Sequence, residues 1–323
     1  MTPLRIKFID GYPDFSPNNN YIINRLRPHF SLELVEDPDF LFYSVSDYKH
    51  AESRYDHCVK IWYTEENYRP DFTQCDYALS FDYVENEPRH LRWPLYLRGD
   101  GCGHPPQLVK RPNLDATTVL KSKSKFCNFL YSNDKAQTRI RFFEKLSRYK
   151  SVDSGGTVRN NLDYQVSPGI HEKLKFMTPY KFTIAFENAR YPGYTTEKLV
   201  EPMMVGSIPI YWGNFLVGRD FNTRSFVNCH DYATFEEAID EIFQLDRDDG
   251  RYIARLKEPW LIDNVESNCF RPDYAMAFFE RVFTTPRHPC PRWSGVTPRR
   301  FDVSWKPLPN PDIVDSTEFR VFE

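Results

Sequence analysis

Thr196, Glu197 and Lys198 stand at a position where the chain could bind a phosphate group. An apolar run at 181–186 ends there, a loop with Pro and Gly follows, and Thr196 is a favourable cap for a helix that begins with Glu197 and Lys198. A helix N-terminus carries about half a positive charge and binds phosphate, and Lys198 would add a full charge. The alternative, an ordinary surface helix with solvated side chains, stays open on these residues alone.

Two Asp-x-Asp triplets, Asp37-Pro38-Asp39 and Asp246-Arg247-Asp248, have the pattern with which many sugar-nucleotide enzymes hold a divalent metal. Proline favours a turn in the first triplet. The second triplet lies between two expected helices, where acidic residues cap the next helix. We therefore predict structural roles for both triplets and no metal site.

The elements that must position these residues form two series of alternating strands and helices. In the first series, a helix capped by Asn20 accompanies strands expected at 4–9, 32–35, 40–43, 59–63 and 77–80. In the second, strands are expected at 126–131, 181–186 and 208–212, and helices at 136–149, 196–204, 234–245, 248–257 and 270–283. These lengths predict doubly wound parallel sheets, that is, an α/β fold. The turn-rich, basic stretch 98–125 is the predicted linker, and a proline-rich tail follows Pro286.

Composition narrows the class of protein. The 323 residues carry 42 Lys plus Arg and 45 Asp plus Glu, which argues against a nucleic-acid binder. The longest apolar stretches are far shorter than the ~20 residues of a membrane span. Aromatic residues make up 16%, and 25 prolines outnumber 13 glycines, which favours a loop-rich protein that stacks a flat or sugar-like ligand or, more simply, an aromatic core.

The cysteines and the start of the chain bear on its compartment. Seven cysteines form no CxxC pair, no Asn-x-Ser/Thr triplet occurs, and the first residues contain no apolar signal region. We expect a reducing, cytoplasmic setting, with peripheral association at a membrane left open. A secreted ectodomain separated from its signal would look the same.

The run from Tyr180 to Gly213 resembles the α1,3/4-fucosyltransferases of glycosyltransferase family 10. It contains a Phe-Glu-Asn loop at 186–188, Tyr-x-Thr-Glu-Lys at 194–198, and then Pro209 with two apolar residues and Gly213. Further matches in the same order are Tyr63-Thr64-Glu65-Glu66-Asn67 with Pro70 and Phe72, Ser132-Asn133 with Arg139, and the run 155–160. The likeness extends from about residue 60 to 215 and more loosely over the rest.

This resemblance implies two Rossmann-like domains facing a cleft, the GT-B arrangement. We assign residues 1–115 to an acceptor-binding domain and 116–323 to a donor-binding domain with the tail. The implied reaction is the inverting transfer of L-fucose from GDP-fucose to the 3-hydroxyl of GlcNAc. N-acetyllactosamine-type glycans would be the acceptors and a Lewis x-like glycan the product.

The family's site residues fall on particular positions of this chain. Glu66 matches the general base, although its neighbour Glu65 leaves a swapped assignment open. Arg139 and Lys198 match the cations that stabilise the departing GDP, and Tyr194 matches a tyrosine that reaches the diphosphate. Asn188 and Glu197 match residues that contact the donor sugar or ribose. With two cations and a helix N-terminus present, the resemblance implies no requirement for a metal or other cofactor.

The chain departs from the family pattern at Ala189, Thr195 and Pro202, which bear on loop shape and acceptor choice rather than on the chemistry. It lacks the heptad repeats of some bacterial members, so the oligomeric state stays open. Three alternatives remain: a non-catalytic glycan-binding relic of the same fold, α1,4 transfer to another acceptor hydroxyl, or use of another GDP-sugar.

Overall fold

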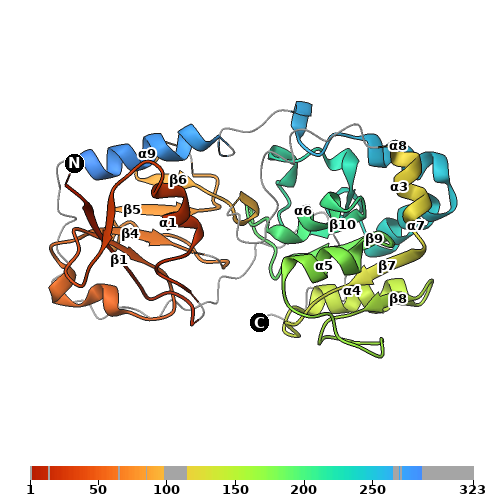
Figure 1. The fold of residues 1–323 in the computed structure, drawn as a ribbon. Helices are drawn as coiled ribbons and strands as arrows, with labels where there is room; N and C mark the ends of the chain where they lie inside the picture. The colour runs from red at the N-terminus through yellow and green to blue at the C-terminus, as the bar shows by residue number, and fades with distance from the viewer. Residues whose placement is uncertain are drawn as a thin grey trace. The chain divides into compact units, whose positions relative to one another are not determined.

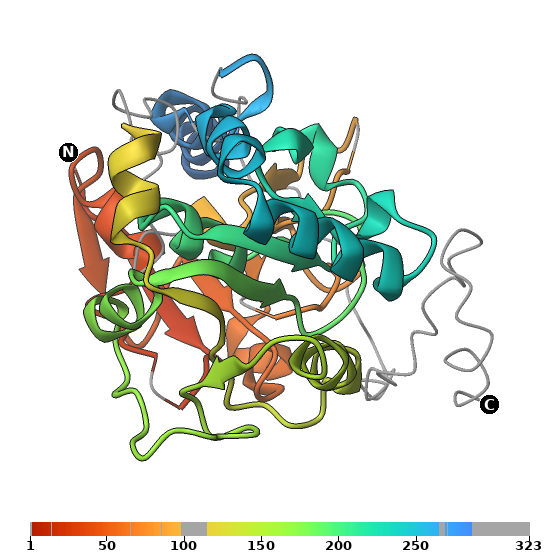
Figure 2. The same cartoon turned by 90° about the vertical axis from the view of Figure 1, so that its right-hand side faces the viewer.

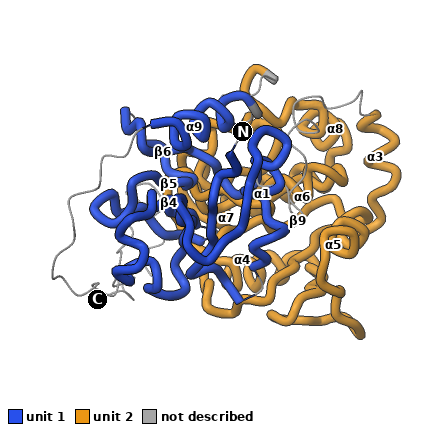
Figure 3. Tube along the Cα trace, turned by 60° about the vertical axis from the view of Figure 1, so that its left-hand side comes forward, with its two compact units in different colours: residues 1–100, 267–305 blue, residues 101–266, 306–323 orange. Residues whose placement is uncertain are grey.

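The computed structural model describes residues 2–13, 15–64, 66–84, 86–97, 115–264, 269 and 271–285. The chain divides into two compact units, which Figure 3 shows in two colours. Unit 1 comprises residues 1–100 and 267–305, and unit 2 comprises residues 101–266 and 306–323. Residues 98–114 of the predicted linker 98–125, the tail after Pro286, and Glu65 lie outside the described residues.

Unit 1 is built on a six-stranded parallel sheet in the order β2-β1-β3-β4-β5-β6 (Figure 1). The strands are β1 (Leu4–Ile9), β2 (Leu32–Leu34), β3 (Phe40–Tyr43), β4 (Val59–Tyr63), β5 (Tyr77–Ser80) and β6 (His90–Arg92). The ends of β3, β4 and β5 are continuous buried runs, as expected where a parallel sheet is covered on both faces. Asn20 precedes helix α1 (Tyr21–Leu26), and its side chain accepts hydrogen bonds from the backbone N–H groups of Ile22 and Ile23, which confirms the predicted cap.

Helix α9 (Pro272–Thr284) returns from the far end of the chain to cover unit 1. Its buried side chains recur every three or four residues, and Phe279 packs edge-on against Trp93 at 6.1 Å between ring centroids. Phe283 contacts the rings of Phe30 and Phe40 in the same way. The predicted domains, 1–115 and 116–323, therefore differ from the structure at this helix, which belongs with the first unit.

Unit 2 is built on a five-stranded parallel sheet in the order β11-β10-β9-β7-β8. The strands are β7 (Lys125–Phe129), β8 (Val152–Ser154), β9 (Tyr180–Phe186), β10 (Ile208–Trp212) and β11 (Val227–Asn228). The helices, which cover both faces in Figure 2, are α3 (Ala116–Ser122), α4 (Gln137–Ser147), α5 (Ile170–Met177), α6 (Glu197–Met204), α7 (Phe235–Arg247) and α8 (Asp249–Lys257). One apolar core joins α3, α4, α7 and α8 to the strands, whereas α6 packs on β9 and β10.

The predicted α/β class with two parallel sheets is confirmed. Within the predicted linker 98–125, however, residues 116–122 form α3 and Lys125 begins β7, because Asp115 caps a helix whose Ala116 is buried. Strands β6, β8 and β11 and helix α5 were not predicted; the first three are only two or three residues long. None of the helices in the described ranges is long and apolar enough to cross a membrane.

Candidate functional site

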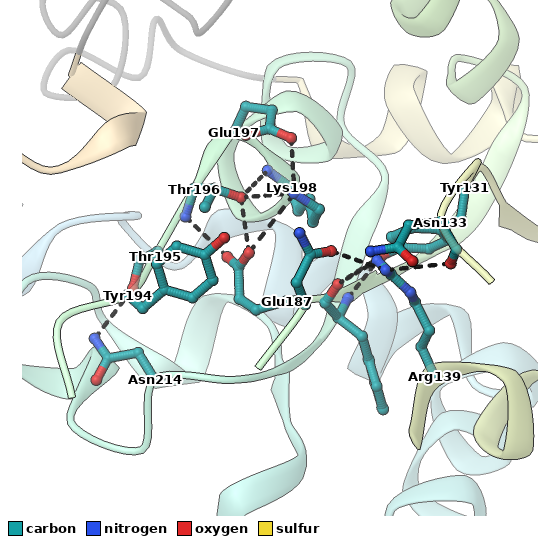
Figure 4. A network of polar contacts seen from close by, with 12 residues as sticks. Tyr131, Asn133, Arg139, Glu187, Tyr194, Thr195, Thr196, Glu197, Lys198 and Asn214 are labelled. Atoms are coloured by element: carbon teal, nitrogen blue, oxygen red, sulfur yellow. Dashed lines mark hydrogen bonds and ion pairs between the residues drawn. The ribbon is translucent and has the colours of Figure 1, made fainter. Parts of the chain in front are cut away.

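Glu187 anchors the candidate site at the carboxyl end of β9 (Figure 4). Its carboxylate is buried and accepts hydrogen bonds from the backbone N–H and the hydroxyl of Thr196, both at 2.8 Å. Thr196 in turn caps α6, so Glu187 fixes where that helix begins. A Cβ at Gly213 would lie only 2.4 Å from Cγ of Glu187, which makes glycine necessary there. The predicted strand, loop and capped helix are thereby confirmed.

Lys198 lies between two carboxylates at the start of α6. Its Nζ donates to Oε1 of Glu197 at 2.9 Å and to the hydroxyl of Thr196 at 3.2 Å, and lies 3.8 Å from Oε2 of Glu187. Burial alone would lower the pKa of Lys198, but the two glutamates hold it well above its usual value. Lys198 is therefore a fixed, permanently charged cation whose side chain remains 19% exposed.

The two glutamates beside Lys198 differ in their proton affinity. Burial raises the pKa of Glu187 to about 7, against the opposing effect of Lys198. Burial also opposes ionisation of Glu197, but its contact with Lys198 prevails and lowers its pKa to about 2. At neutral pH the group therefore carries one firm ion pair, Glu197–Lys198, and one buried carboxyl that readily takes up a proton.

Arg139 forms the second half of the site and comes from the first turn of α4. It is almost fully buried, and its guanidinium lies 4.2 Å from the centroid of the Tyr131 ring and donates to Oδ1 of Asn188 at 2.8 Å. The Tyr131 hydroxyl bonds the backbone of Phe186 and Ile184, which fixes the ring. Nε of Arg139 is buried and has no hydrogen-bond partner among the described residues.

Glu187 and Asn188 are consecutive, so the Lys198 half and the Arg139 half of the site adjoin (Figure 4). Of the predicted donor-site residues, the structure thus brings together Arg139 with Asn188, and Lys198 with Glu197. Tyr194 is buried beside them, and its hydroxyl contributes electrostatically to the raised pKa of Lys198.

Asn214 shapes the loop that carries Tyr194. Its side chain accepts hydrogen bonds from the backbone N–H of Gly193 and of Leu216, both at 2.9 Å, and donates to the hydroxyl of Thr195 at 3.0 Å. Thr195, one of the departures from the family pattern, is therefore a buried partner of Asn214 rather than a surface residue. This bond gives Thr195 a role in fixing the shape of the loop.

Glu66 belongs to unit 1 and follows β4 after a tight turn. Thr64 is fully buried, and its hydroxyl accepts from the N–H of Glu66 at 3.1 Å and donates to the Glu66 carbonyl at 3.0 Å. Glu66 is half-buried at the carboxyl end of the strand, the edge at which parallel α/β sheets bind ligands.

Neither Asp-x-Asp triplet joins a cluster of metal-binding side chains in the described ranges. Asp37 pairs with Arg5, and Asp246 pairs with Lys150 and with Lys181. Asp248 caps α8 by accepting from the N–H of Arg251, as predicted.

Sequence reasoning missed three residues that build the site: Glu187, Tyr131 and Asn214. Glu187 was visible in the Phe-Glu-Asn motif, but a glutamate after a strand gives no sign that it will be buried against a helix N-terminus. The side chain of Tyr131 is hydrogen-bonded to Ile184, which is 53 positions away in the sequence, and that of Asn214 is hydrogen-bonded to Gly193, which is 21 positions away. No local pattern marks such contacts.

Two family models match this chain. Residues 6–98 match the N-terminal domain of α-(1,3)-fucosyltransferase FucT, and residues 120–260 match glycosyltransferase family 10 (fucosyltransferase), C-terminal part. The chain is 36% identical over 233 residues to the α-(1,3)-fucosyltransferase FucT of Helicobacter pylori, which covers 63% of this chain and 48% of that protein. It spans about half or less of the length of the first curated relatives it matches.

Solved structures extend this similarity over most of the chain. A crystal structure of α1,3-fucosyltransferase with GDP is 30% identical, with a TM-score of 0.72 over 87% of this chain and 90% of that one. A crystal structure of α1,3-fucosyltransferase with GDP-fucose is 29% identical, with a TM-score of 0.71 over 89% and 92%.

Proposed function

We propose, from the fact that this chain belongs to glycosyltransferase family 10, that it transfers L-fucose from GDP-fucose to the 3-hydroxyl of GlcNAc in N-acetyllactosamine-type glycans. The observation that carries the proposal is the Glu187–Thr196–Lys198 and Arg139–Asn188 network at the carboxyl end of β9. Relatives of this fold and similar sequence were solved with GDP and with GDP-fucose.

In the proposed donor complex, Lys198 and Arg139 bind the diphosphate, and the start of α6 adds its partial positive charge. These groups stabilise the negative charge that develops on the departing GDP. Because Arg139 already donates to Asn188, the two residues are positioned together, and Asn188 and Glu197 remain for the donor sugar or ribose. Tyr194 adds a hydroxyl beside Lys198.

Glu66 is the proposed general base. It would take the proton of the acceptor hydroxyl as that oxygen attacks the anomeric carbon on the face opposite GDP, so the configuration at that carbon inverts. The turn closed by Thr64 fixes the backbone of Glu66, which limits the orientations the carboxylate can take.

Two protein cations supply the charge that a divalent ion provides in other sugar-nucleotide enzymes. We therefore expect turnover to be the same with Mg²⁺ or Mn²⁺ and with excess EDTA. A loss of more than about tenfold on chelation would contradict this part of the proposal.

The deciding experiment incubates the protein with GDP-fucose and a panel of type 1 and type 2 disaccharides, followed by mass and linkage analysis. The proposal predicts an α1,3-linked fucose on the GlcNAc of type 2 acceptors, and almost no product from Lys198→Ala. An α1,4 product on type 1 acceptors would reassign the acceptor hydroxyl. Glycan binding with no product, with this or any other GDP-sugar, would indicate a binding relic.

A further inference from the structure

The segment 66–69, which begins with Glu66, is held at its C-terminal end by Arg69. Nη2 of Arg69 donates to Oδ1 of Asn67 at 2.6 Å, and Nη1 donates to the carbonyl of Tyr68 at 2.7 Å. The N–H of Tyr68 donates to the carbonyl of Glu66 at 2.7 Å. One guanidinium thus holds the two residues that directly follow Glu66.

Arg69 is itself fixed to the connection between β5 and β6. Its Nε lies 3.1 Å from Oδ1 of Asp82, and its guanidinium lies 4.7 Å from the centroid of the Phe81 ring. The side chain of Asp82 is only 9% exposed, so this ion pair is shielded from solvent on the carboxylate side. Arg69 and Asp82 thus link the segment that follows β4 to the segment that follows β5.

A buried polar chain fixes Asp82 in turn. The hydroxyl of Ser80 donates to Oδ2 of Asp82 at 2.7 Å and lies 2.8 Å from Nε2 of His90. Because burial and the nearby Arg92 lower the pKa of His90 to about 4, its ring is neutral at pH 7. The single Ser80 proton is directed at Asp82, so Nε2 of His90 must be the protonated nitrogen that donates to Ser80.

We propose that Arg69 and Asp82 are positioning residues for the Glu66 carboxylate, a role that rests on the proposed function of Glu66 as general base. Neither contacts substrate in this assignment. Through Asn67 and Tyr68 they fix the loop from its C-terminal side, as Thr64 does from its N-terminal side. A base displaced by about 1 Å can lose on the order of 10²-fold in rate, so a rigid clamp at this loop has catalytic value.

The test is a double-mutant cycle between Asp82→Asn and Glu66→Gln, with kcat and the KM for GDP-fucose measured for each protein. Asp82→Asn removes the charge and keeps the shape. We expect kcat to fall about 10- to 10²-fold while the KM for GDP-fucose changes by less than about twofold. Combined with Glu66→Gln, Asp82→Asn should cause no further loss, because the group that it positions is already gone.

Arg69→Lys is the second variant. It keeps the charge but lacks the planar fork that holds Asn67, Tyr68 and Asp82 together, so it should reproduce the fall in kcat. Glu87→Gln is the matched control. Glu87 pairs with Arg89 at 2.9 Å in the same β5–β6 connection, and Arg89 also lies over a phenylalanine ring, that of Phe72. The kcat of the Glu87→Gln variant should stay within about twofold of the kcat of the parent protein.

The outcomes separate this inference from the proposed function. Full turnover by Glu66→Gln would overturn the general base itself. If Glu66→Gln is slow but Asp82→Asn and Arg69→Lys keep the parent rate, the positioning role is wrong. It is also wrong if Asp82→Asn slows the Glu66→Gln protein by a further tenfold, since that is the behaviour of a general structural defect. GDP titration and thermal unfolding of each variant confirm that the protein compared is folded.

Discussion

At the scale of single residues, the proposed donor site contains two glutamates, Glu187 and Glu197, whose pKa values differ. Glu197 gives Lys198 a permanent counter-ion, and Glu187 holds the backbone of Thr196 while keeping a pKa of about 7. A diphosphate bound at Lys198 brings further negative charge toward Glu187. That charge must raise the pKa of Glu187 further, because the ionised form becomes less favourable.

Binding of GDP-fucose should therefore be accompanied by proton uptake near pH 7. The complex holds more protons than the free protein, so the affinity for GDP-fucose falls as pH rises through about 6 to 8. The total fall is at most about tenfold for each unit by which binding raises the pKa of Glu187. GDP-fucose suits the test because its substituted diphosphate does not itself titrate in this range. Calorimetry in buffers of different ionisation enthalpy measures the uptake directly.

Glu187→Gln should abolish this proton uptake. Glu201→Gln is the matched control, because burial raises the pKa of Glu201 to about 7 as well, but its carboxylate is paired with Lys173 at 2.8 Å. This variant should retain most of the uptake. Equal loss in both variants, or no uptake in the parent protein, would contradict the assignment to Glu187.

At the scale of elements, sequence patterns predicted strands and helices wherever the segment was long or clearly capped. The strands at 4–9, 40–43, 59–63 and 208–212 have the bounds that their apolar runs indicate. Asn20 and Thr196 identified the helices that they cap. Helix α5 follows Gly169 with no side-chain cap, and β8 is three residues long, so neither carries a local signal. What holds these segments is tertiary packing.

The loop at 155–161 shows how tightly the elements beside Arg139 fit. A Cβ at Gly156 would lie 2.2 Å from the carbonyl oxygen of Tyr131 and 2.7 Å from its nitrogen, both backbone atoms. Gly156→Ala should therefore lower the free energy of unfolding by about 1–3 kcal/mol, measured by denaturant titration. Gly218→Ala, whose Cβ would meet only a methyl group at 3.6 Å, should stay within about 0.5 kcal/mol of the parent. Equal stability of both variants would contradict this packing.

At the scale of the whole molecule, the chain builds two parallel-sheet units and returns to the first with its last described helix. The helix itself was predicted at 270–283, but its amphipathic pattern shows only that one face is buried, not which sheet covers it. The helix packs on unit 1 because three of its side chains contact aromatic rings of that unit: Phe278, Phe279 and Phe283. The predicted domain boundary missed this because contacts between segments some 200 residues apart leave no local trace.

Phe279→Ala tests whether GDP binding depends on unit 2 and not on the packing of α9 in unit 1. Phe279 is fully buried, so its truncation should cost about 3–5 kcal/mol of unfolding free energy. Because the residues of the proposed donor site lie in unit 2, the Kd for GDP of the folded protein should be unchanged at a temperature below the unfolding transition. Glu280→Ala, on the exposed face of the same helix, serves as the control and should alter neither quantity. A loss of GDP affinity that accompanies the loss of stability in Phe279→Ala would contradict the placement of GDP binding in unit 2.

The central claim is that Glu66 in unit 1 takes the acceptor's proton while Lys198 and Arg139 in unit 2 hold the nucleotide. The most direct measurement is the turnover of Glu66→Gln at saturating GDP-fucose and acceptor, with the Kd for GDP determined on the same preparation. We predict that turnover falls by about 10²-fold or more while the Kd stays within about twofold of the parent value. Turnover equal to that of the parent, or a Kd weakened in proportion to the rate, would contradict the account.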